Sequence, residues 1–100
     1  MEITKQKAFF DACFLGDLEK AKHIYSLGNL DIHAKNEKAF RWSCYSGHLE
    51  VSKWLYSLGY LDIHAENECA FRWSCQNGHL ESAKWLYSLG DIDIHAEKEY

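Results

Sequence analysis

Apolar residues recur at helical spacing in two short blocks near the middle of the chain. In the block 39–46, Phe40 and Cys44 stand four positions apart, and in the block 49–58 apolar residues such as Leu55 lie opposite charged ones on a helical projection. Residues four positions apart share one face of a helix, so each block predicts a short amphipathic helix. Helices of about ten residues are marginal alone in water, and we therefore expect packing between helices to stabilise them.

Turn residues follow both predicted helices. Gly47 comes after the first block and Gly59 after the second, and glycine readily takes the positive φ that ends a helix. Residues 60–68 are too few for another helix and alternate between polar and apolar, which predicts an extended, turn-like connection. The candidates for N-caps of the first helices are Thr4, Asn36 and Asn67.

The whole pattern recurs every 31 residues. The phrase Gly-His-Leu-Glu begins at Gly47 and Gly78 with a weaker copy at Gly16, and Asp-Ile-His-Ala begins at Asp31, Asp62 and Asp93. A regular period of about 20 to 50 residues is typical of a solenoid, in which each unit buries its apolar face only against its neighbours. We therefore predict an all-α solenoid of three helix-turn-helix units with short extended connecting loops, covering 8–38, 39–69 and 70–100 after a leader at 1–7.

One half of the unit carries a family resemblance. Residues 47–59 read G-H-L-E-V-S-K-W-L-Y-S-L-G and residues 61–65 read L-D-I-H-A. This resembles the ankyrin repeat, three times in register over residues 8–100, although the first helix opens with Ala-Phe-Arg-Trp and the connection is shorter than in that family. The variant is similar to the ankyrin arrays of giant DNA viruses. The resemblance implies a protein-interaction module with no enzyme activity and no cofactor, whose concave face binds a protein partner, a host protein if the chain is viral.

The terminal units differ in polarity. In the first unit Asp11 stands where the others have Trp42 and Trp73, and Lys20 and His23 also replace apolar residues. A terminal repeat has no neighbour on one side, so these changes predict an N-terminal cap, with residue 1 as the true start. The third unit keeps its aromatic residues and shows no C-terminal cap. We expect its open side to be covered by a further segment of a longer chain, by self-association or by a partner.

Charge and composition limit the classes of partner. The 100 residues carry a net charge of -4 and the lysines are scattered, which argues against nucleic-acid binding. No apolar run approaches the roughly 20 residues that span a bilayer, and the N-terminus lacks the apolar core of a signal peptide. We therefore expect no membrane partner and an intracellular, cytoplasmic protein, in the host cell if it is viral.

Positions that are identical in all units predict the core of the stack. Two apolar sets have this property, Phe9, Phe40 and Phe71 with Leu27, Leu58 and Leu89. One cysteine in each unit has it too, and Cys13, Cys44 and Cys75 are expected to be small buried side chains and not disulfide partners. Cys69 breaks this pattern and is expected at the surface.

Five of the six histidines also follow the repeat. They are spread along the array without the short spacings of a zinc site, so no metal is expected. The histidine of each Gly-His pair is expected to bond backbone groups at the turn between helices. Cys69 and His64 could form a thiolate-imidazole pair, but an array of short helices offers no deep cleft for catalysis, and we expect no enzyme activity.

Positions that vary between the units are the candidates for partner binding. They lie at the ends of the first helices and in the connections, which the resemblance places along the concave groove, and they are Phe14, Leu15, Lys35, Lys38, Tyr45, Ser46, Glu66, Cys69, Gln76 and Asn77. Two further candidates, Trp42 and Trp73, either face the groove as aromatic anchors or pack between units. We expect an apolar surface on unit one and a polar one on unit three, with charge changing from Lys35 and Lys38 to Glu66 and Glu68. The leading hypothesis is a protein-interaction module, and the alternative is a structural spacer or part of a longer array without a dedicated partner.

Overall fold

All the regular secondary structure in the described part of the chain is helical. The computed structural model describes residues 4–92, and these form six helices and no strand. The helices are α1 (Lys5–Leu15), α2 (Leu18–Ser26), α3 (Ala34–Tyr45), α4 (Leu49–Ser57), α5 (Ala65–Gln76) and α6 (Leu80–Ser88). The all-α prediction is confirmed. Residues 93–100 of the expected third unit, with the question of its C-terminal cap, lie outside the described residues.

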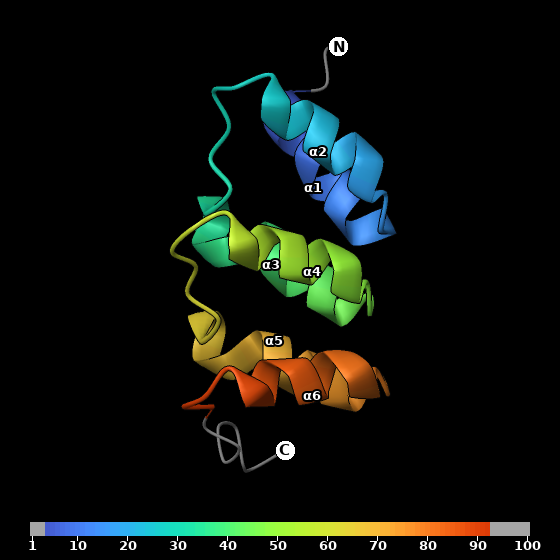
Figure 1. Ribbon diagram of the computed structural model, residues 1–100, viewed down its shortest axis with the longest axis vertical. Helices are drawn as coiled ribbons and strands as arrows, with labels where there is room; N and C mark the ends of the chain where they lie inside the picture. Colours follow the sequence, from blue (N-terminus) through green and yellow to red (C-terminus); the bar gives the residue numbers. More distant parts are fainter. Residues whose placement is uncertain (1–3, 93–100) are drawn as a thin grey trace.

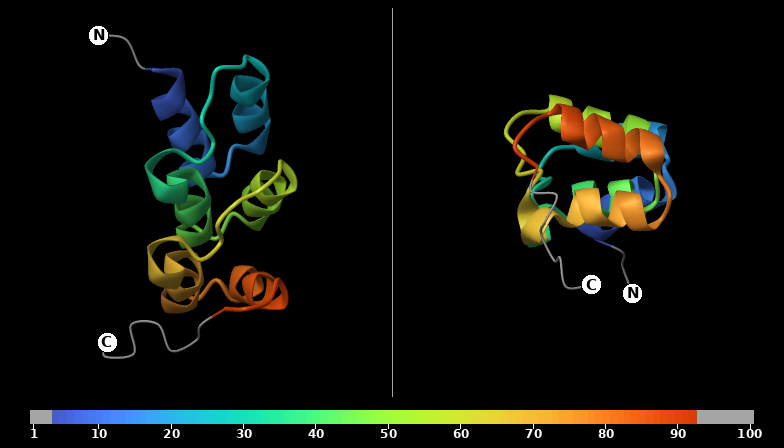
Figure 2. Two further views of the ribbon diagram at one scale, coloured as in Figure 1. Left: turned by 90° about the vertical axis from the view of Figure 1, so that its left-hand side faces the viewer. Right: turned by 90° about the horizontal axis from the view of Figure 1, so that it is seen from below.

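Three helix pairs stack in sequence order (Figure 1). Each pair is antiparallel, and α1, α3 and α5 form one layer while α2, α4 and α6 form the other (Figure 2). We call these the first-helix layer and the second-helix layer. The stack measures 41 × 23 × 23 Å, and α3 packs against both α1 and α5. The contacts between repeats one and two form the first junction, and those between repeats two and three form the second.

The two junctions share an aromatic core contact. Phe9 and Phe40 are fully buried at 0% exposure. Across the first junction the ring centroid of Trp54 lies 6.1 Å from that of Phe9, and across the second junction Trp85 lies 6.2 Å from Phe40. Both phenylalanines are therefore core, as expected. Leu27 was wrongly assigned to the core, because it follows the end of α2 in the outermost repeat and is 56% exposed.

The Gly-His pairs link neighbouring repeats. Gly16 ends α1 with a φ of 79°, and a Cβ at this position would lie 2.5 Å from Nδ1 of His48 in the next repeat. Gly47 and His79 repeat this arrangement, with a φ of 76° and the same 2.5 Å approach. Neither imidazole makes the expected capping bond to the backbone. Each ring instead packs on the glycine of the preceding repeat, where a side chain would not fit.

Three consecutive residues near the start of α3 and of α5 adopt the left-handed conformation. The φ values are 57°, 58° and 64° at Lys35, Asn36 and Glu37, and 59°, 57° and 61° at Glu66, Asn67 and Glu68. We call each segment a left-handed turn, and the right-handed part of α3 or α5 follows it. The assignment of Asn36 and Asn67 as N-caps was therefore wrong. Thr4 does cap α1, because its Oγ1 accepts a hydrogen bond of 3.1 Å from the amide of Lys7.

An arginine of the following helix stabilises each left-handed turn. Left-handed backbone costs about 1–2 kcal/mol for each residue that has a Cβ, so the turn needs compensating contacts. Arg41 donates from Nη2 to the carbonyl of Lys35 at 3.0 Å and from Nε to that of Asn36 at 2.9 Å. Arg72 donates in the same way to the carbonyls of its own turn. Hydrogen bonds from a charged donor are stronger than neutral ones, so each arginine stabilises the turn that it contacts.

The carboxylate in the first left-handed turn also binds the connection that follows α4. Glu37 is only 5% exposed, and its Oε2 accepts a hydrogen bond of 3.0 Å from the amide of Asp62. Its Oε1 lies 2.9 Å from Nδ1 of His33, which explains the recurring histidine. In the first repeat Gln6 occupies the position of Glu37, and its amide pairs with the backbone of Asp31 at 2.8 and 3.2 Å. Gln6 and Glu37 therefore each bind the backbone of the connection that follows their own helix pair.

Candidate protein-interaction site

An aromatic row crosses all three repeats on the first-helix layer. It consists of Phe14, Trp42, Tyr45 and Trp73, which come from α1, α3 and α5. Ring centroids lie 5.5 Å apart for Phe14 and Trp42, 5.3 Å for Trp42 and Trp73, and 5.0 Å for Tyr45 and Trp73. Most of these pairs meet edge to face, a geometry that aromatic rings favour. The row joins the repeats into one continuous surface.

The two tryptophans both pack between units and reach the surface. Trp42 and Trp73 contact each other across the second junction and remain half-buried. Their neighbours in the row, Phe14 and Tyr45, are 39% and 38% exposed. The expected packing between units is therefore seen, and the role as aromatic anchors for a partner stays a prediction. Partly exposed, mutually packed rings lose little side-chain freedom when a partner covers them.

Polar and apolar candidates flank the aromatic row. Leu15 is 69% exposed at the end of α1, and Gln76 and Asn77 are exposed at the end of α5. The Nδ2 of Asn77 donates a hydrogen bond of 3.2 Å to the carbonyl of Tyr45, so this side chain also crosses the second junction. Ser46 is half-buried beside the row. Ser46, Gln76 and Asn77 are the polar members of this set, and protein interfaces commonly have a polar rim of this kind.

A groove lies beside the row at the first junction. It has a volume of about 470 Å³ and is lined by Thr4, Gln6, Lys7, Phe10, Asp11, Phe14, Lys35, Lys38 and Trp42. We call it the α1–α3 groove. It brings together four sequence candidates, Phe14, Lys35, Lys38 and Trp42. Lys7, Phe10 and Asp11 were missed as site residues, although their alignment with Lys38, Arg41 and Trp42 of the next repeat was visible in the sequence.

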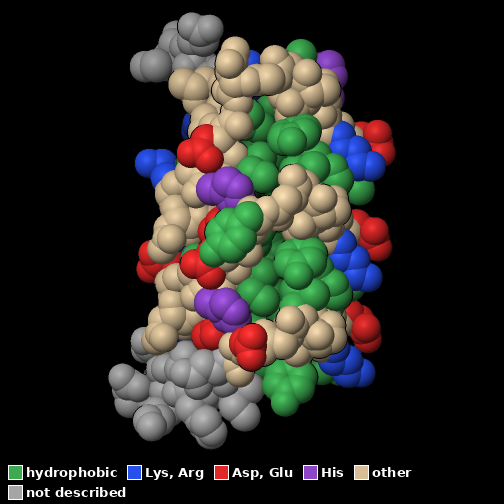
Figure 3. Space-filling view, turned by 60° about the vertical axis from the view of Figure 1, so that its left-hand side comes forward, with side chains coloured by type: hydrophobic (Ala, Val, Ile, Leu, Met, Phe, Trp, Pro, Cys, Tyr) green, Lys and Arg blue, Asp and Glu red, His purple; other side chains and the backbone are tan. Residues whose placement is uncertain are grey.

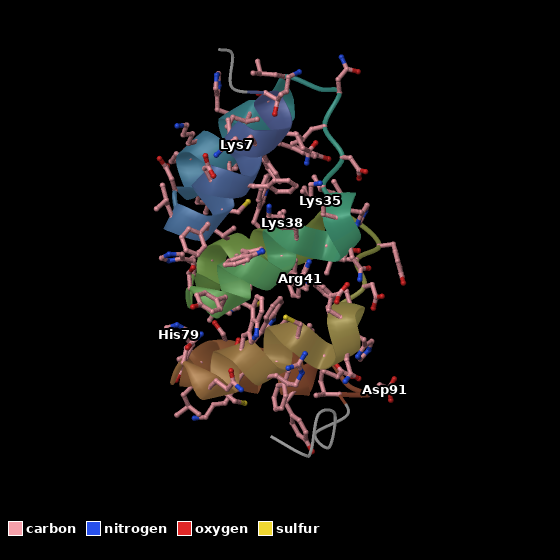
Figure 4. All side chains as sticks on the ribbon, turned by 180° about the vertical axis from the view of Figure 1, so that it is seen from behind. Lys7, Lys35, Lys38, Arg41, His79 and Asp91 are labelled. Carbon is pink, nitrogen blue, oxygen red and sulfur yellow. The ribbon has the colours of Figure 1, made fainter. Side chains whose placement is uncertain are left out.

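The charged side chains that line the α1–α3 groove are mostly cationic. Lys7 and Asp11 form an ion pair at 3.1 Å. The ammonium of Lys38 lies 4.8 Å from the centre of the Phe10 ring, a cation–π arrangement. Lys35 is exposed on the left-handed turn. Lys7, Lys35 and Lys38 follow one another along the first-helix layer, with Arg41 next to them toward α5 (Figure 4).

The corresponding positions at the second junction are occupied differently. Trp42 stands in place of Asp11 and packs on Trp73, and Arg41 stands in place of Phe10. The Nη1 of Arg41 lies 4.0 Å from Sγ of Cys69, which is only 3% exposed. Cys69 was therefore wrongly expected at the surface, and it is withdrawn as a contact residue because Arg41 and its own helix cover it.

Fewer residues than expected contribute to the difference in surface charge between the two junctions. Glu68 is 6% exposed and lies 2.8 Å from Nδ1 of His64, so it contributes little to the surface. Glu66 is exposed and accepts a hydrogen bond from Nδ2 of Asn36. The contrast on the surface therefore lies between Lys35 and Lys38 at the first junction and Glu66 at the second.

The thiols show no activation. Burial raises the pKa of Cys13 and Cys44 from 9.0 to about 12. Burial also raises the pKa of Cys69, although the neighbouring Arg41 opposes the shift, and the pKa of Cys75 is raised for the same reason. Cys75 is exposed, so the expectation that all three repeated cysteines are buried was wrong for the third. A nucleophilic thiol requires a lowered pKa, and these shifts have the opposite sign.

Two further classes of site were sought among residues 4–92. No group of three or more histidine, cysteine, aspartate or glutamate side chains in this range is arranged to hold a metal ion. No helix in it has the length and apolar character needed to cross a bilayer. The strongest candidate surface in the described part of the chain is therefore the aromatic row with its adjoining groove.

Comparison with known proteins agrees with this architecture. The family model for ankyrin repeats, in three copies, matches residues 9–98. No curated protein matches the chain in sequence. Ankyrin repeats generally mediate protein–protein interaction and are generally not enzymes. Since the match covers nearly the whole length and the helices stack in sequence order, the chain belongs to the ankyrin-repeat family.

Proposed function

We propose that the chain binds a protein partner through its first-helix layer, the concave side of an ankyrin array, without catalysing a reaction. The observation that carries this proposal is the aromatic row, because it is continuous over three repeats and its outer rings are more than one-third exposed. Aromatic side chains dominate the energetics of protein interfaces. The similarity to giant-virus arrays extends the proposal to a host protein as the partner.

The second-helix layer is a poorer candidate for the same role. It presents alternating charges along the stack, from Glu19, Lys22, Glu50, Lys53, Glu81 and Lys84, all of them exposed (Figure 3). Solvated charges of both signs at the helix surface contribute little to binding. This layer therefore supplies the solvent-facing side of the stack and a control surface for experiments.

Site-directed photocrosslinking tests the proposal. A photoreactive amino acid at Tyr45 or Gln76, on the first-helix layer, is expected to capture a discrete protein from cell lysate. The same amino acid at Lys53 or Lys84, on the second-helix layer, is expected not to capture it. Equal capture from both layers, or from neither, would contradict the proposal and favour a spacer without a dedicated partner.

A matched pair of substitutions gives the energetic test. Tyr45→Ala removes a ring that is 38% exposed and contacts Trp73, and Tyr56→Ala removes a ring that is 40% exposed and contacts Trp85. Truncating an interface anchor commonly costs about 2 kcal/mol or more of binding free energy. We expect this loss for Tyr45→Ala alone, measured by titration of the captured protein. Similar losses for both variants would place the site elsewhere.

A further inference from the structure

The α1–α3 groove exists because the first repeat has a small acidic side chain where later repeats have tryptophan. At the second junction the indole of Trp42 occupies this position and packs 5.3 Å from Trp73. At the first junction Asp11 takes its place and turns to Lys7, which leaves a volume of about 470 Å³ beside Trp42. That volume lies within the range of about 300–1,000 Å³ found for ligand pockets.

The charges around this space are not balanced within the described residues. Asp11 is the one acidic side chain among the described residues of the lining, and it pairs with Lys7. Lys35 and Lys38 make no ion pair with any described carboxylate. Two ammonium groups therefore border an aromatic hollow in a chain whose net charge is -4. A partner that supplies carboxylates here would meet attraction at this position and repulsion over much of the remaining surface.

The backbone that carries Lys35 is held in place before any partner arrives. Its carbonyl accepts a hydrogen bond of 3.0 Å from Arg41, and the adjacent Asn36 donates to Glu66 of the next repeat. The ammonium of Lys38 rests over the Phe10 ring. Preorganised groups lose less conformational freedom on binding, so both cations favour a ligand more than mobile surface lysines would.

The groove is continuous with the aromatic row, since Phe14 and Trp42 belong to both. We propose that the α1–α3 groove binds an acidic segment of the protein partner, in which a large apolar side chain inserts among the rings of Phe10, Phe14 and Trp42 while adjacent carboxylates pair with Lys35 and Lys38. This inference rests on the proposed function. Glu66 at the second junction disfavours carboxylates there, so the acidic part of the segment lies over the first junction.

Binding of a designed probe tests the inference on the full chain. The probe is a short dye-labelled peptide in which glutamates flank a single phenylalanine, and fluorescence anisotropy measures its affinity. Lys35→Glu combined with Lys38→Glu is expected to weaken binding by about tenfold or more, because each change replaces attraction by repulsion. Glutamate is compatible with the left-handed backbone at this position, since Glu66 has the same conformation in the next repeat.

Matched controls separate the groove from general charge effects. Lys53→Glu combined with Lys84→Glu makes the same change in net charge on the second-helix layer and is expected to leave the affinity within about twofold. Probes with glutamine for glutamate, or alanine for phenylalanine, are expected to bind about tenfold more weakly. Higher salt is expected to weaken the binding of the acidic probe to the chain.

Each contrary result has a defined meaning. Equal affinity for the parent chain and the Lys35→Glu/Lys38→Glu variant, or no binding of the acidic probe, overturns the inference. Displacement of the probe by a short single-stranded oligonucleotide at comparable concentration also overturns it, because the groove would then select anions in general. If photocrosslinking at Tyr45 and Gln76 still captures a protein with the double variant, the proposed function stands without the inference.

Discussion

The first and second junctions have the same interior and different surfaces. Phe9 meets Trp54 at one junction as Phe40 meets Trp85 at the other, both with an interplanar angle of 55°. On the first-helix layer, however, one junction has a cationic groove and the other a packed pair of indoles. Core positions are constrained by both neighbouring repeats, whereas surface positions of the same unit are free to differ. In such an array, substitutions at a few outward positions create a site without altering the stack.

Removing the shared core ring tests whether the two interiors are equivalent. Phe9→Ala and Phe40→Ala are each expected to lower the free energy of unfolding by about 3–5 kcal/mol, because each leaves a cavity in a fully buried site. Urea unfolding followed by circular dichroism measures both. A loss below about 1 kcal/mol for either variant would show that its junction can collapse around the missing ring.

The Gly-His contacts give a second comparison, with a third glycine as the control. Gly47→Ala is expected to cost about 3 kcal/mol, from left-handed backbone and from collision with the His79 ring. Gly78 has a φ of 74° but no described atom within 4 Å of an added Cβ, so Gly78→Ala isolates the backbone cost of about 1–2 kcal/mol. Gly16→Ala should match Gly47→Ala. Equal losses at all three glycines, measured by thermal unfolding, would mean that the histidine rings move aside freely.

The buried thiols predict how the stability of the chain depends on pH. The pKa of Cys44 is raised from 9.0 to about 12, so this thiol stays protonated in the folded chain where the unfolded chain would lose its proton. This thiol leaves the free energy of unfolding unchanged below pH 9.0 and lowers it as the pH rises toward 12, by about 1 kcal/mol at pH 10. The stability difference between pH 8 and pH 10 should therefore be smaller in Cys44→Ala than in Cys75→Ala. Equal pH dependence in the two variants would contradict the assigned burial.

Filling the α1–α3 groove should make the first junction resemble the second on the first-helix layer. Asp11→Trp places an indole beside Trp42 and is expected to stabilise the chain by about 0.5–1.5 kcal/mol through ring contacts. It should also abolish binding of the acidic probe. Asp11→Ala is the control, because it removes the ion pair with Lys7 and leaves the groove open. Probe affinity that survives Asp11→Trp would show that the hollow beside Trp42 is not the binding position.

Much of the fold was predictable because each helix is defined by local residues. Gly47 and the spaced leucines after it predict the turn and α4, and α4 runs from Leu49 to Ser57 as expected within one residue. The left-handed turns were not predictable in this way. Their stability depends on Arg41, which lies beyond the turn, and on the amide of Asp62 in the next repeat. Propensity alone predicted an asparagine N-cap at the same position.

Sequence reasoning found those site residues that have a large or variable side chain of their own. Tyr45 and Trp42 were identified because they are large and vary between units or are absent from the first. The groove depends on a missing side chain at Asp11, and its size becomes apparent only when α1 and α3 are stacked. Cys69 was misplaced because the residue that covers it, Arg41, comes from α3, a different helix.

The carboxylate of Glu37 has a consequence for how such arrays change over generations. Its bond to the amide of Asp62 fixes the number of residues between one turn and the next. Inserting or deleting a single residue in that interval would move the amide out of reach and leave a buried acid with His33 but without its backbone donor, a costly state. An array built in this way gains or loses length by duplication or deletion of whole modules, while point substitutions on its outer positions supply new specificities.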